Sequence, residues 1–322
     1  MRGRALEEAS GGAGSGRTIR FVIADGSDAA ESSQDRSVEL RELSSRADYE
    51  QCLQLQQATW GRDFRELVPP TILAISQKVG GVLAGAFSAR GESPHREAPA
   101  GEAELLGFVY GLTGVRKGEL AHWSHMLAVR DDARGLGLGK RLKLYQRQRL
   151  IELGCETMYW TFDPLVARNA NLNLGRLGAR PCEYVVDMYG TETGSDLHSG
   201  LGTDRFVVEW RFARPEIARG LENGVRWSSP APAGDAVVIG PSEDPAAQVA
   251  RLAGERPPVF WVAVPPDVER LKRDDRAEGL RWRDAMRTAM VWAFANGYRV
   301  VGLAGDLRRD GRIWYRLERP GG

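Results

Sequence analysis

Cysteine and histidine are scarce in this chain, which has three cysteines and four histidines among its 322 residues. The cysteines are odd in number and widely spaced, and no CxxC pair is present, so the sequence favours neither a disulfide framework nor a structural zinc site. We therefore expect no metal. Lysine is rare as well, because most of the 44 basic residues are arginine, and this bias is typical of a GC-rich, bacterial genome.

An excess of one charge and a long apolar run are also missing. The 44 basic residues are balanced by 43 acidic ones, which gives a net charge of +1. Without surplus positive charge, binding to a nucleic-acid backbone gains little from counterion release. No run approaches the ~18 to 20 apolar residues that cross a bilayer, and no shorter apolar stretch resembles a secretory signal. We expect no nucleic-acid partner, no membrane partner and a cytoplasmic location.

The length suggests about two folding units at roughly 150 residues per domain. Residues 1–36 are rich in Gly, Ser, Ala, Asp and Glu, and we predict a disordered tail in which only Ile19–Ile23 could pack. We then predict a first domain over residues 37–213, a Pro-, Gly- and Ala-rich linker over 214–257, and a smaller C-terminal β-α-β-β subdomain over 258–322.

Hydrophobic periodicity predicts the elements of both domains. In the first domain we expect strands at Val38–Leu43, Gly81–Ala89, Leu105–Leu112, Ala121–Val129, Thr157–Phe162, Glu183–Met188 and Arg205–Phe212, and helices at Arg46–Trp60, Pro69–Lys78, Leu138–Leu153 and Pro164–Leu177. In the second we expect strands at Val259–Val264, Val300–Ala304 and Ile313–Leu317 and a helix near Arg276–Asn296. The fold class is α/β in the α+β sense.

A Gly-rich turn between a strand and the longest helix of the first domain is the most informative run. Gly135, Gly137 and Gly139 alternate there, directly before Lys140. Without Cβ atoms, consecutive N–H groups can approach an anion, and the helix N-terminus adds about half a positive charge. The pattern favours a pyrophosphate site, with a purely structural turn as the alternative. A P-loop is excluded because Arg141 follows Lys140, and a dinucleotide fingerprint would follow the first strand rather than the fourth.

The same run resembles motif A of the GNAT N-acetyltransferase superfamily, [Arg/Gln]-x-x-Gly-x-[Gly/Ala], with Arg134, Gly137 and Gly139 at the matching positions. The element order from Val38 to Phe212 is similar to that fold. A long subfamily of GNAT acyltransferases with a C-terminal extension is resembled further by the runs His122–Val129, Trp160–Leu165, Arg168–Asn173 and Thr203–Phe206. The resemblance implies a mixed central sheet flanked by helices, acyl-CoA (acetyl-CoA or succinyl-CoA) as co-substrate, and direct transfer to an amine.

The resemblance also implies which residues bind coenzyme A. Backbone groups of Leu127 and Val129 would bond the pantetheine arm, and Asn169 would reach the cofactor. The pyrophosphate would lie against Arg134, Gly135, Gly137, Gly139 and Lys140. Asn169, Asn171 and Asn173 are poor residues for a helix interior, which indicates independently that some of these amides bind a ligand.

His125 is the predicted general base. Side chains alternate along a strand, so His125, Leu127 and Val129 should share one face, with His122 on the other. An acceptor amine must lose a proton before it attacks a thioester, and an imidazole with a pKa of ~6.5 suits that task, directly or through a water. The alternative for His125 is a hydrogen-bonded residue of the core.

Four residues are candidates for binding the acceptor. Asp163 is predicted either to cap the next helix or to bind and deprotonate an ammonium group. Arg205 and Arg65 could hold a carboxylate, because a guanidinium matches it in a bidentate way; for Arg205 the alternative is a surface ion pair. Trp60 and Arg65 lie in the loop 59–68, where GNAT proteins build acceptor specificity. We predict a small amine or amino acid as acceptor.

Leu174 departs from the family pattern. Many GNAT enzymes carry at this place a tyrosine that protonates the leaving thiolate. Tyr159, Tyr184 or Tyr189 could substitute, or water could supply the proton. The departure, together with the C-terminal extension, leaves a non-catalytic acyl-CoA-binding regulatory or interaction protein as the alternative function, and a homodimer as an open alternative for the assembly.

Overall fold

The computed structural model describes residues 18–23, 36–88, 103–190, 194–195, 200–234, 236–242, 244–307 and 309–319. Most of the predicted tail and the loop 90–102 lie outside the described residues. The chain divides into two compact units, Met1–Glu156 and Thr157–Gly322. The division falls inside the predicted domain 37–213, whose boundaries stay a prediction. Within the described parts, no helix is both long enough and apolar enough to span a bilayer.

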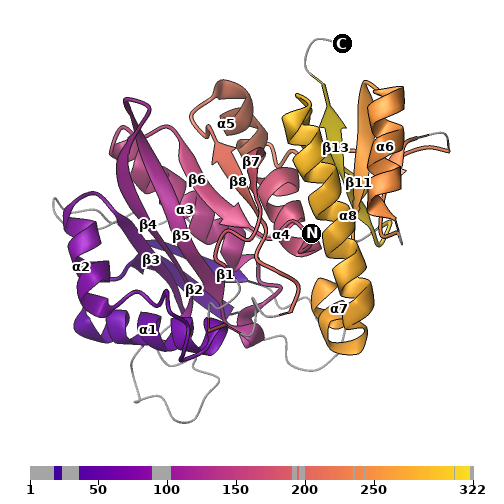
Figure 1. Ribbon diagram of the computed structural model, residues 1–322. Coiled ribbons are helices and arrows are strands. Elements are labelled where there is room, and N and C mark those ends of the chain that lie inside the picture. Colours follow the sequence, from indigo (N-terminus) through magenta and orange to yellow (C-terminus); the bar gives the residue numbers. More distant parts are fainter. Residues whose placement is uncertain are drawn as a thin grey trace, which may run out of the picture. The chain divides into compact units, whose positions relative to one another are not determined.

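The first unit contains an antiparallel sheet in the order β1-β2-β3-β4-β5 (Figure 1). The strands are β1 Ile19–Ile23, β2 Arg36–Glu42, β3 Val82–Ser88, β4 Leu105–Arg116 and β5 Glu119–Val129. All of β3 and the first seven residues of β4 are buried. Continuous apolar runs of this kind are typical of strands covered on both faces.

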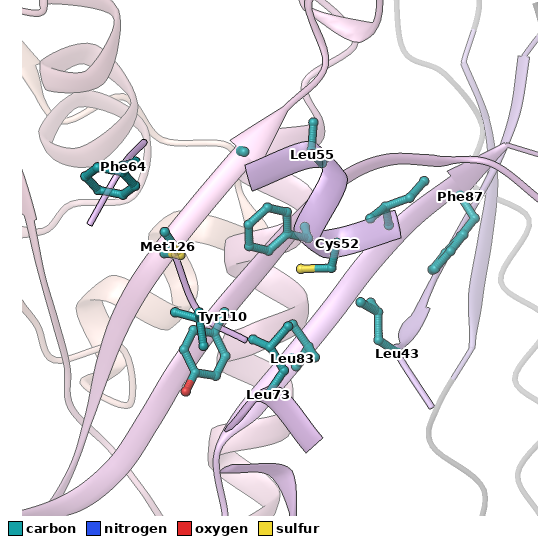
Figure 2. Packing of buried hydrophobic residues seen from close by; sticks show 13 residues of the cluster. Leu43, Cys52, Leu55, Phe64, Leu73, Leu83, Phe87, Tyr110 and Met126 are labelled. Atoms are coloured by element: carbon teal, nitrogen blue, oxygen red, sulfur yellow. The ribbon is translucent and has the colours of Figure 1, made fainter. Parts of the chain in front are cut away.

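Three helices cover the two faces of this sheet. On one face, α1 (Arg46–Trp60) and α2 (Pro70–Lys78) enclose the core shown in Figure 2, which includes Leu83 and Tyr110. On the other face, α3 (Leu138–Glu152) packs on a second core through Leu142. A capping box at Ser45 starts α1 and a proline in the first turn starts α2, as the local sequence predicts.

The second unit contains two sheets. The first has the antiparallel order β6-β8-β7, from Met158–Phe162, Arg205–Trp210 and Arg180–Val185. The second has the mixed order β10-β11-β13-β12-β9, from Val238–Ile239, Val259–Val264, Ile313–Glu318, Arg299–Ala304 and Ser228–Ser229. Its helices are α4 Ala167–Ala170, α5 Pro215–Glu222, α6 Pro245–Glu255, α7 Val268–Asp274 and α8 Arg276–Ala295. The α/β fold class predicted from the sequence is confirmed.

The C-terminal residues of the second unit pack directly on its first sheet. The hydroxyl of Tyr315 in β13 donates to the carbonyl of Pro164 at 2.7 Å, and the Tyr315 ring meets that of Phe206 in β8 edge to face, with centroids 5.1 Å apart. Trp227 N–H donates to Gly175 O at 3.0 Å. Residues on both sides of the segment 214–257 therefore share one core.

Two segments differ from their predicted structure. Residues 214–257, predicted to be a linker, hold α5 and α6, because Pro215 and Pro245 start these helices rather than interrupt a chain and Asp244 caps α6. The helix predicted over 164–177 is a single turn, α4, followed by the π-helical segment Asn171–Arg176. Its asparagines and Gly175 are weak helix formers, which explains the departure from regular α-geometry.

Candidate functional site

The Gly-rich turn of the first unit has the geometry of an anion-binding loop. A 3₁₀ turn, Asp131–Ala133, ends at Arg134, and Gly135 and Gly137 then take positive φ angles of 89° and 73°. Only glycine adopts this backbone readily. A Cβ atom added at Gly135 or Gly137 would meet none of the described residues within 4 Å. The backbone of the turn is therefore open to a ligand.

The start of α3 leaves its first N–H groups without a side-chain cap. Gly137 is the N-cap residue, and no described side chain accepts from the first turn. That turn has no acidic residue and contains Lys140, and Arg134 lies beside it, paired with Asp131 at 2.6 Å. Uncapped N–H groups, the positive end of the helix dipole and two cationic side chains together favour an anion.

A β-bulge changes which face of β5 each side chain occupies. Tyr110 in β4 is opposite Met126 and Gly111 is opposite Ser124, so His125 has no partner in the described register of the two strands. Leu127 packs on the core beneath α3, whereas the His125 ring lies 6.1 Å from the Tyr110 ring in the core on the opposite face. The expectation that His125 shares a face with Leu127 and Val129 is wrong, because the extra residue shifts the alternation.

His125 is thereby directed to the side of the sheet that carries α1, α2 and the loop between them. It keeps an exposed edge, while enclosure of the rest of the ring lowers its pKa and the nearby Glu66 acts in the opposite direction. In the same core Trp60 stacks on Phe64 with centroids 6.0 Å apart. Gln56 fixes the end of the loop by accepting from Val68 N–H at 2.8 Å. The other loop candidate, Arg65, is exposed.

His122 lies on the α3 side and belongs to a buried chain of hydrogen bonds. Lys143 donates to Ser124 at 2.7 Å, and Ser124 donates to Gln146 Oε1 at 2.8 Å. The Gln146 amide then meets His122 Nε2 at 2.9 Å, and His122 Nδ1 meets Thr113 Oγ1 at 2.9 Å. Thr113 in turn donates to a backbone carbonyl. The donors all point one way only if His122 is neutral with its proton on Nδ1.

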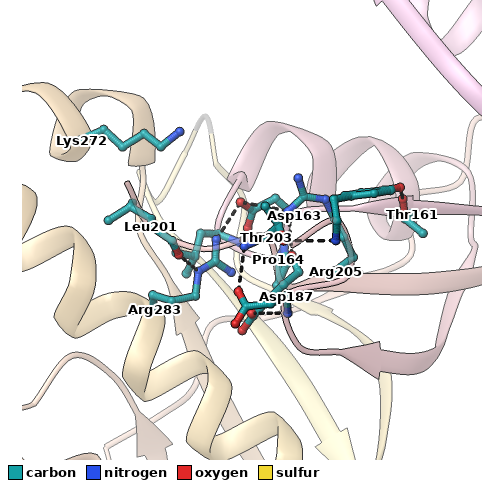
Figure 3. A network of polar contacts seen from close by, with 12 residues as sticks. Thr161, Asp163, Pro164, Asp187, Leu201, Thr203, Arg205, Lys272 and Arg283 are labelled. Atoms are coloured by element: carbon teal, nitrogen blue, oxygen red, sulfur yellow. Dashed lines mark hydrogen bonds and ion pairs between the residues drawn. The ribbon is translucent and has the colours of Figure 1, made fainter. Parts of the chain in front are cut away.

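In the second unit, Asp163 is engaged by two arginines. Its Oδ2 accepts from Arg283 Nη2 at 2.7 Å and lies 3.7 Å from Arg205 Nη1, while Oδ1 accepts from Leu165 N–H at 2.9 Å (Figure 3). The N-cap of α4 is Val166, so Asp163 closes a turn before the helix and does not cap it. Its carboxylate is a counterion, which leaves little of it for an ammonium group.

A second ion network lies alongside. Asp204 has a fully buried side chain and accepts from Arg287 Nη2 at 2.5 Å and from the Tyr184 hydroxyl at 2.6 Å. Arg287 also contacts Asp187 at 2.9 Å. Desolvation alone would raise the pKa of Asp204, but the hydrogen bonds from Arg287 and Tyr184 lower it below its usual value.

The three tyrosines considered as general acids have different surroundings. Tyr159 donates to Glu209 at 2.6 Å, and burial together with Asp204 raises the pKa of Tyr184. Tyr189 shares a hydrogen bond of 2.8 Å with Thr161. Leu174 itself is fully buried. Tyr189 is thus the candidate whose hydroxyl is not given to a carboxylate by these contacts.

The second unit also holds Asn169, which is half-buried in α4. Asp163 and Arg205 belong to the same unit, whereas the Gly-rich turn, Leu127, Val129, His125 and the loop 59–68 belong to the first. Of the predicted site residues, the structure brings Asp163 and Arg205 together within the second unit.

Sequence reasoning missed Arg283 and Arg287 as site residues. The signal was present, because Arg283 lies among the apolar positions of α8, four residues after Gly279 and three before Met286, all of which are buried. An arginine on the apolar face of a helix is expected to be paired. Among the described residues, no group of three His, Cys, Asp or Glu side chains could hold a metal ion.

No family model matches the chain, and no curated protein matches it. Similar solved structures include NAA60 of Arabidopsis thaliana with a bisubstrate analogue, at 16% identity and a TM-score of 0.41, covering 54% of this chain and 98% of that one. The ribosomal-protein-S18-alanine N-acetyltransferase of Escherichia coli has 16% identity and a TM-score of 0.36, covering 53% and 92%.

An aminoglycoside 6'-N-acetyltransferase complexed with coenzyme A is also similar, at 12% identity and a TM-score of 0.36, covering 53% of this chain and 94% of that one. All three are GNAT acetyltransferases, the superfamily that the Gly-rich turn resembles. At identities and TM-scores this low, we base the function on the residues of this chain alone.

The buried state of His122 makes stability depend on pH. Burial, and next the charge of Lys143, lower its pKa from 6.5 to about 3. A histidine held neutral in the fold stabilises it fully above its unfolded pKa and progressively less as the pH falls toward the folded pKa. We expect the free energy of unfolding to fall by up to about 1.4 kcal/mol per pH unit between pH 6.5 and 3.

Urea denaturation at several pH values measures this slope. In His122→Gln, the part of the slope that belongs to His122 should disappear, because glutamine does not titrate. If wild type and variant lose stability in parallel below pH 6.5, His122 is not the group responsible.

Proposed function

We propose that this protein is an acyl-CoA-dependent N-acyltransferase that moves an acetyl or succinyl group from coenzyme A to a small amine or amino acid. The observation that carries the proposal is the Gly-rich turn, in which Gly137 takes a left-handed conformation at the uncapped start of α3 and the space beside Gly135 and Gly137 is open to the described residues. Such a turn suits a pyrophosphate.

The cofactor contacts follow from this turn. Arg134, Gly135, Gly137, Gly139 and Lys140 would hold the pyrophosphate through N–H groups and positive charge. Leu127 and Val129 contribute their backbone, since their side chains pack on the core beneath α3. Asn169 is proposed to contact coenzyme A by resemblance to the family alone.

His125 is the proposed general base. Its lowered pKa keeps the imidazole neutral at pH 7, so that it can accept a proton from the acceptor ammonium. The bulge directs it to the side of the loop 59–68, where Trp60 and Arg65 would contact the acceptor. Asp163, whose charge is matched by Arg283, is no longer our choice for a base or an ammonium ligand.

The reaction is a direct transfer. The neutral amine attacks the thioester carbonyl, the new C–N bond forms, and the C–S bond breaks to release the thiolate of coenzyme A, which takes a proton. No covalent intermediate on the enzyme is needed. Tyr189, whose hydroxyl is shared with Thr161, or a water would supply that last proton.

Gly137→Glu tests the cofactor site. The new carboxylate would occupy the anion site with a like charge, and we expect calorimetry to detect no binding of coenzyme A or acetyl-CoA. A non-glycine residue at this left-handed position should also destabilise the fold by about 1–2 kcal/mol.

Gly154→Glu is the matched control, because Gly154 has a φ of 74°, a Cβ there also meets none of the described residues, and it follows the other end of α3. It should show similar strain and unchanged binding. Equal loss of binding in both variants, or a wild type that binds no acyl-CoA, would refute the proposal.

His125→Gln tests the base. We expect kcat to fall about 10²- to 10⁴-fold, with unchanged affinity for coenzyme A, because glutamine cannot take the proton. In the wild type, kcat/KM should decline on the acid side at a pH below ~6.5, the ordinary histidine value. Tyr110→Phe, which keeps the ring beside His125 and loses only its hydroxyl bond to Ser76, is the control. A kcat that stays within a few-fold of wild type in His125→Gln would exclude the role.

The second candidate function is a CoA-binding protein without turnover. It is favoured by the buried Leu174 at the place of the usual acid and by the engagement of Tyr159 and Tyr184 with carboxylates. A screen of amines that follows release of free thiol from acetyl-CoA and succinyl-CoA separates the two. We expect release with at least one small amine; tight acyl-CoA binding without release across the screen would favour the second function.

A further inference from the structure

Arg283 has hydrogen-bonding capacity that the described residues do not use. Its side chain is 3% exposed, its Nε donates to Leu201 O at 2.7 Å, and its Nη2 donates to Asp163 at 2.7 Å. Its Nη1 is buried and has no hydrogen-bond partner among the described residues. Figure 3 shows the guanidinium between Leu201 and Asp163. A buried donor left unpaired costs about 1–3 kcal/mol, so native structures seldom retain one without a reason.

The charges around Arg283 are unequal. Arg205, with a side chain 7% exposed, lies 3.7 Å from the same Asp163 oxygen, so two guanidinium groups share one carboxylate. The nearest further carboxylate, Asp204, is already bound by Arg287 and by the Tyr184 hydroxyl. The group formed by Asp163, Arg205 and Arg283 thus carries one net positive charge, in a place where charge is poorly screened by water.

One monovalent anion balances this group better than a phosphate does. A phosphate would bring more negative charge than the single excess cation matches, and it would lie beside the carboxylate of Asp163. A carboxylate brings one charge and accepts from a guanidinium in the fork geometry.

We propose that Arg283, together with Arg205, binds a carboxylate of the substrate. The inference rests on the proposed acyltransferase function and names one feature of its substrate. The carboxylate belongs either to the acyl group, as in succinyl-CoA, or to an amino acid acceptor. In both cases α8 of the C-terminal region supplies the group that selects it.

Two arms of one experiment distinguish these sources. The first compares succinyl-CoA with acetyl-CoA in calorimetry, which needs no turnover. The second compares free amino acids with their amides, for example alanine with alaninamide, by ligand-observed NMR binding. We expect one arm to show a preference for the carboxylate of about 10- to 100-fold, as expected for hydrogen bonds to a charged group.

Arg283→Lys is the diagnostic variant, because it keeps the charge next to Asp163 and loses the fork. It should remove most of the carboxylate preference and leave the affinity for acetyl-CoA, or for the amide, within about 3-fold of wild type. Arg287→Lys is the matched control: it lies one turn further along α8 and is also paired with aspartates, yet it has no unpartnered buried atom among those found in the described residues. It should keep the preference.

Several outcomes overturn the inference without touching the proposed function. One is a wild type that binds acyl-CoA but prefers no carboxylate in either arm. Another is an Arg283→Lys protein that weakens carboxylate ligands and their neutral counterparts equally, which would mean that Nη1 is satisfied by internal water and that Arg283 is only structural. If Arg283→Lys does not fold, the wild-type preference and its loss in Arg205→Lys decide. Absence of any acyl-CoA binding, by contrast, refutes the proposed function itself.

Discussion

Buried aspartates that need cationic partners constrain the whole second unit. The side chain of Asp204 has no exposed surface, and it stays ionised because Arg287 and Tyr184 bind it. Asp163 depends in the same way on Arg283. An isolated charge away from water is very costly, and removal of one partner of a buried pair typically destabilises a protein by about 3–5 kcal/mol. The ends of β6 and β8 therefore hold their shape only while α8 is in place.

This dependence changes the role of the C-terminal region. A separate regulatory module would meet the rest of the chain through an exposed, polar interface. Here, α8 contributes arginines to buried ion pairs, and Tyr315 of β13 lies fully buried, with its hydroxyl on Pro164 O and its ring against Phe206. The extension completes the half of the candidate site that begins at the end of β6. A function for the region as a regulator would have to act through these same contacts.

Local signals were sufficient for most of the fold. The bounds of α1 and β11 match those expected from periodicity, and α3 and α8 differ by a residue at their ends, because long amphipathic patterns depend mainly on residues near in sequence. The segment 214–257 was misjudged for a local reason as well. Proline and small residues are typical of loops, but at the first position of a helix proline is favoured, so composition alone could not separate the two.

The candidate site depended on information that is not local. The ion pairs of Arg283 and Arg287 join residues 83 to 120 positions apart in the chain, so no spacing rule could reveal them. The bulge in β5 has the same origin, because it is a property of the register between β4 and β5 and not of β5 alone. Strict alternation placed His125 over α3; one unpaired residue places it beside Tyr110 instead. The proposed base therefore faces the loop 59–68 only because a strand pairing, invisible in the sequence of either strand, adds one residue at that point.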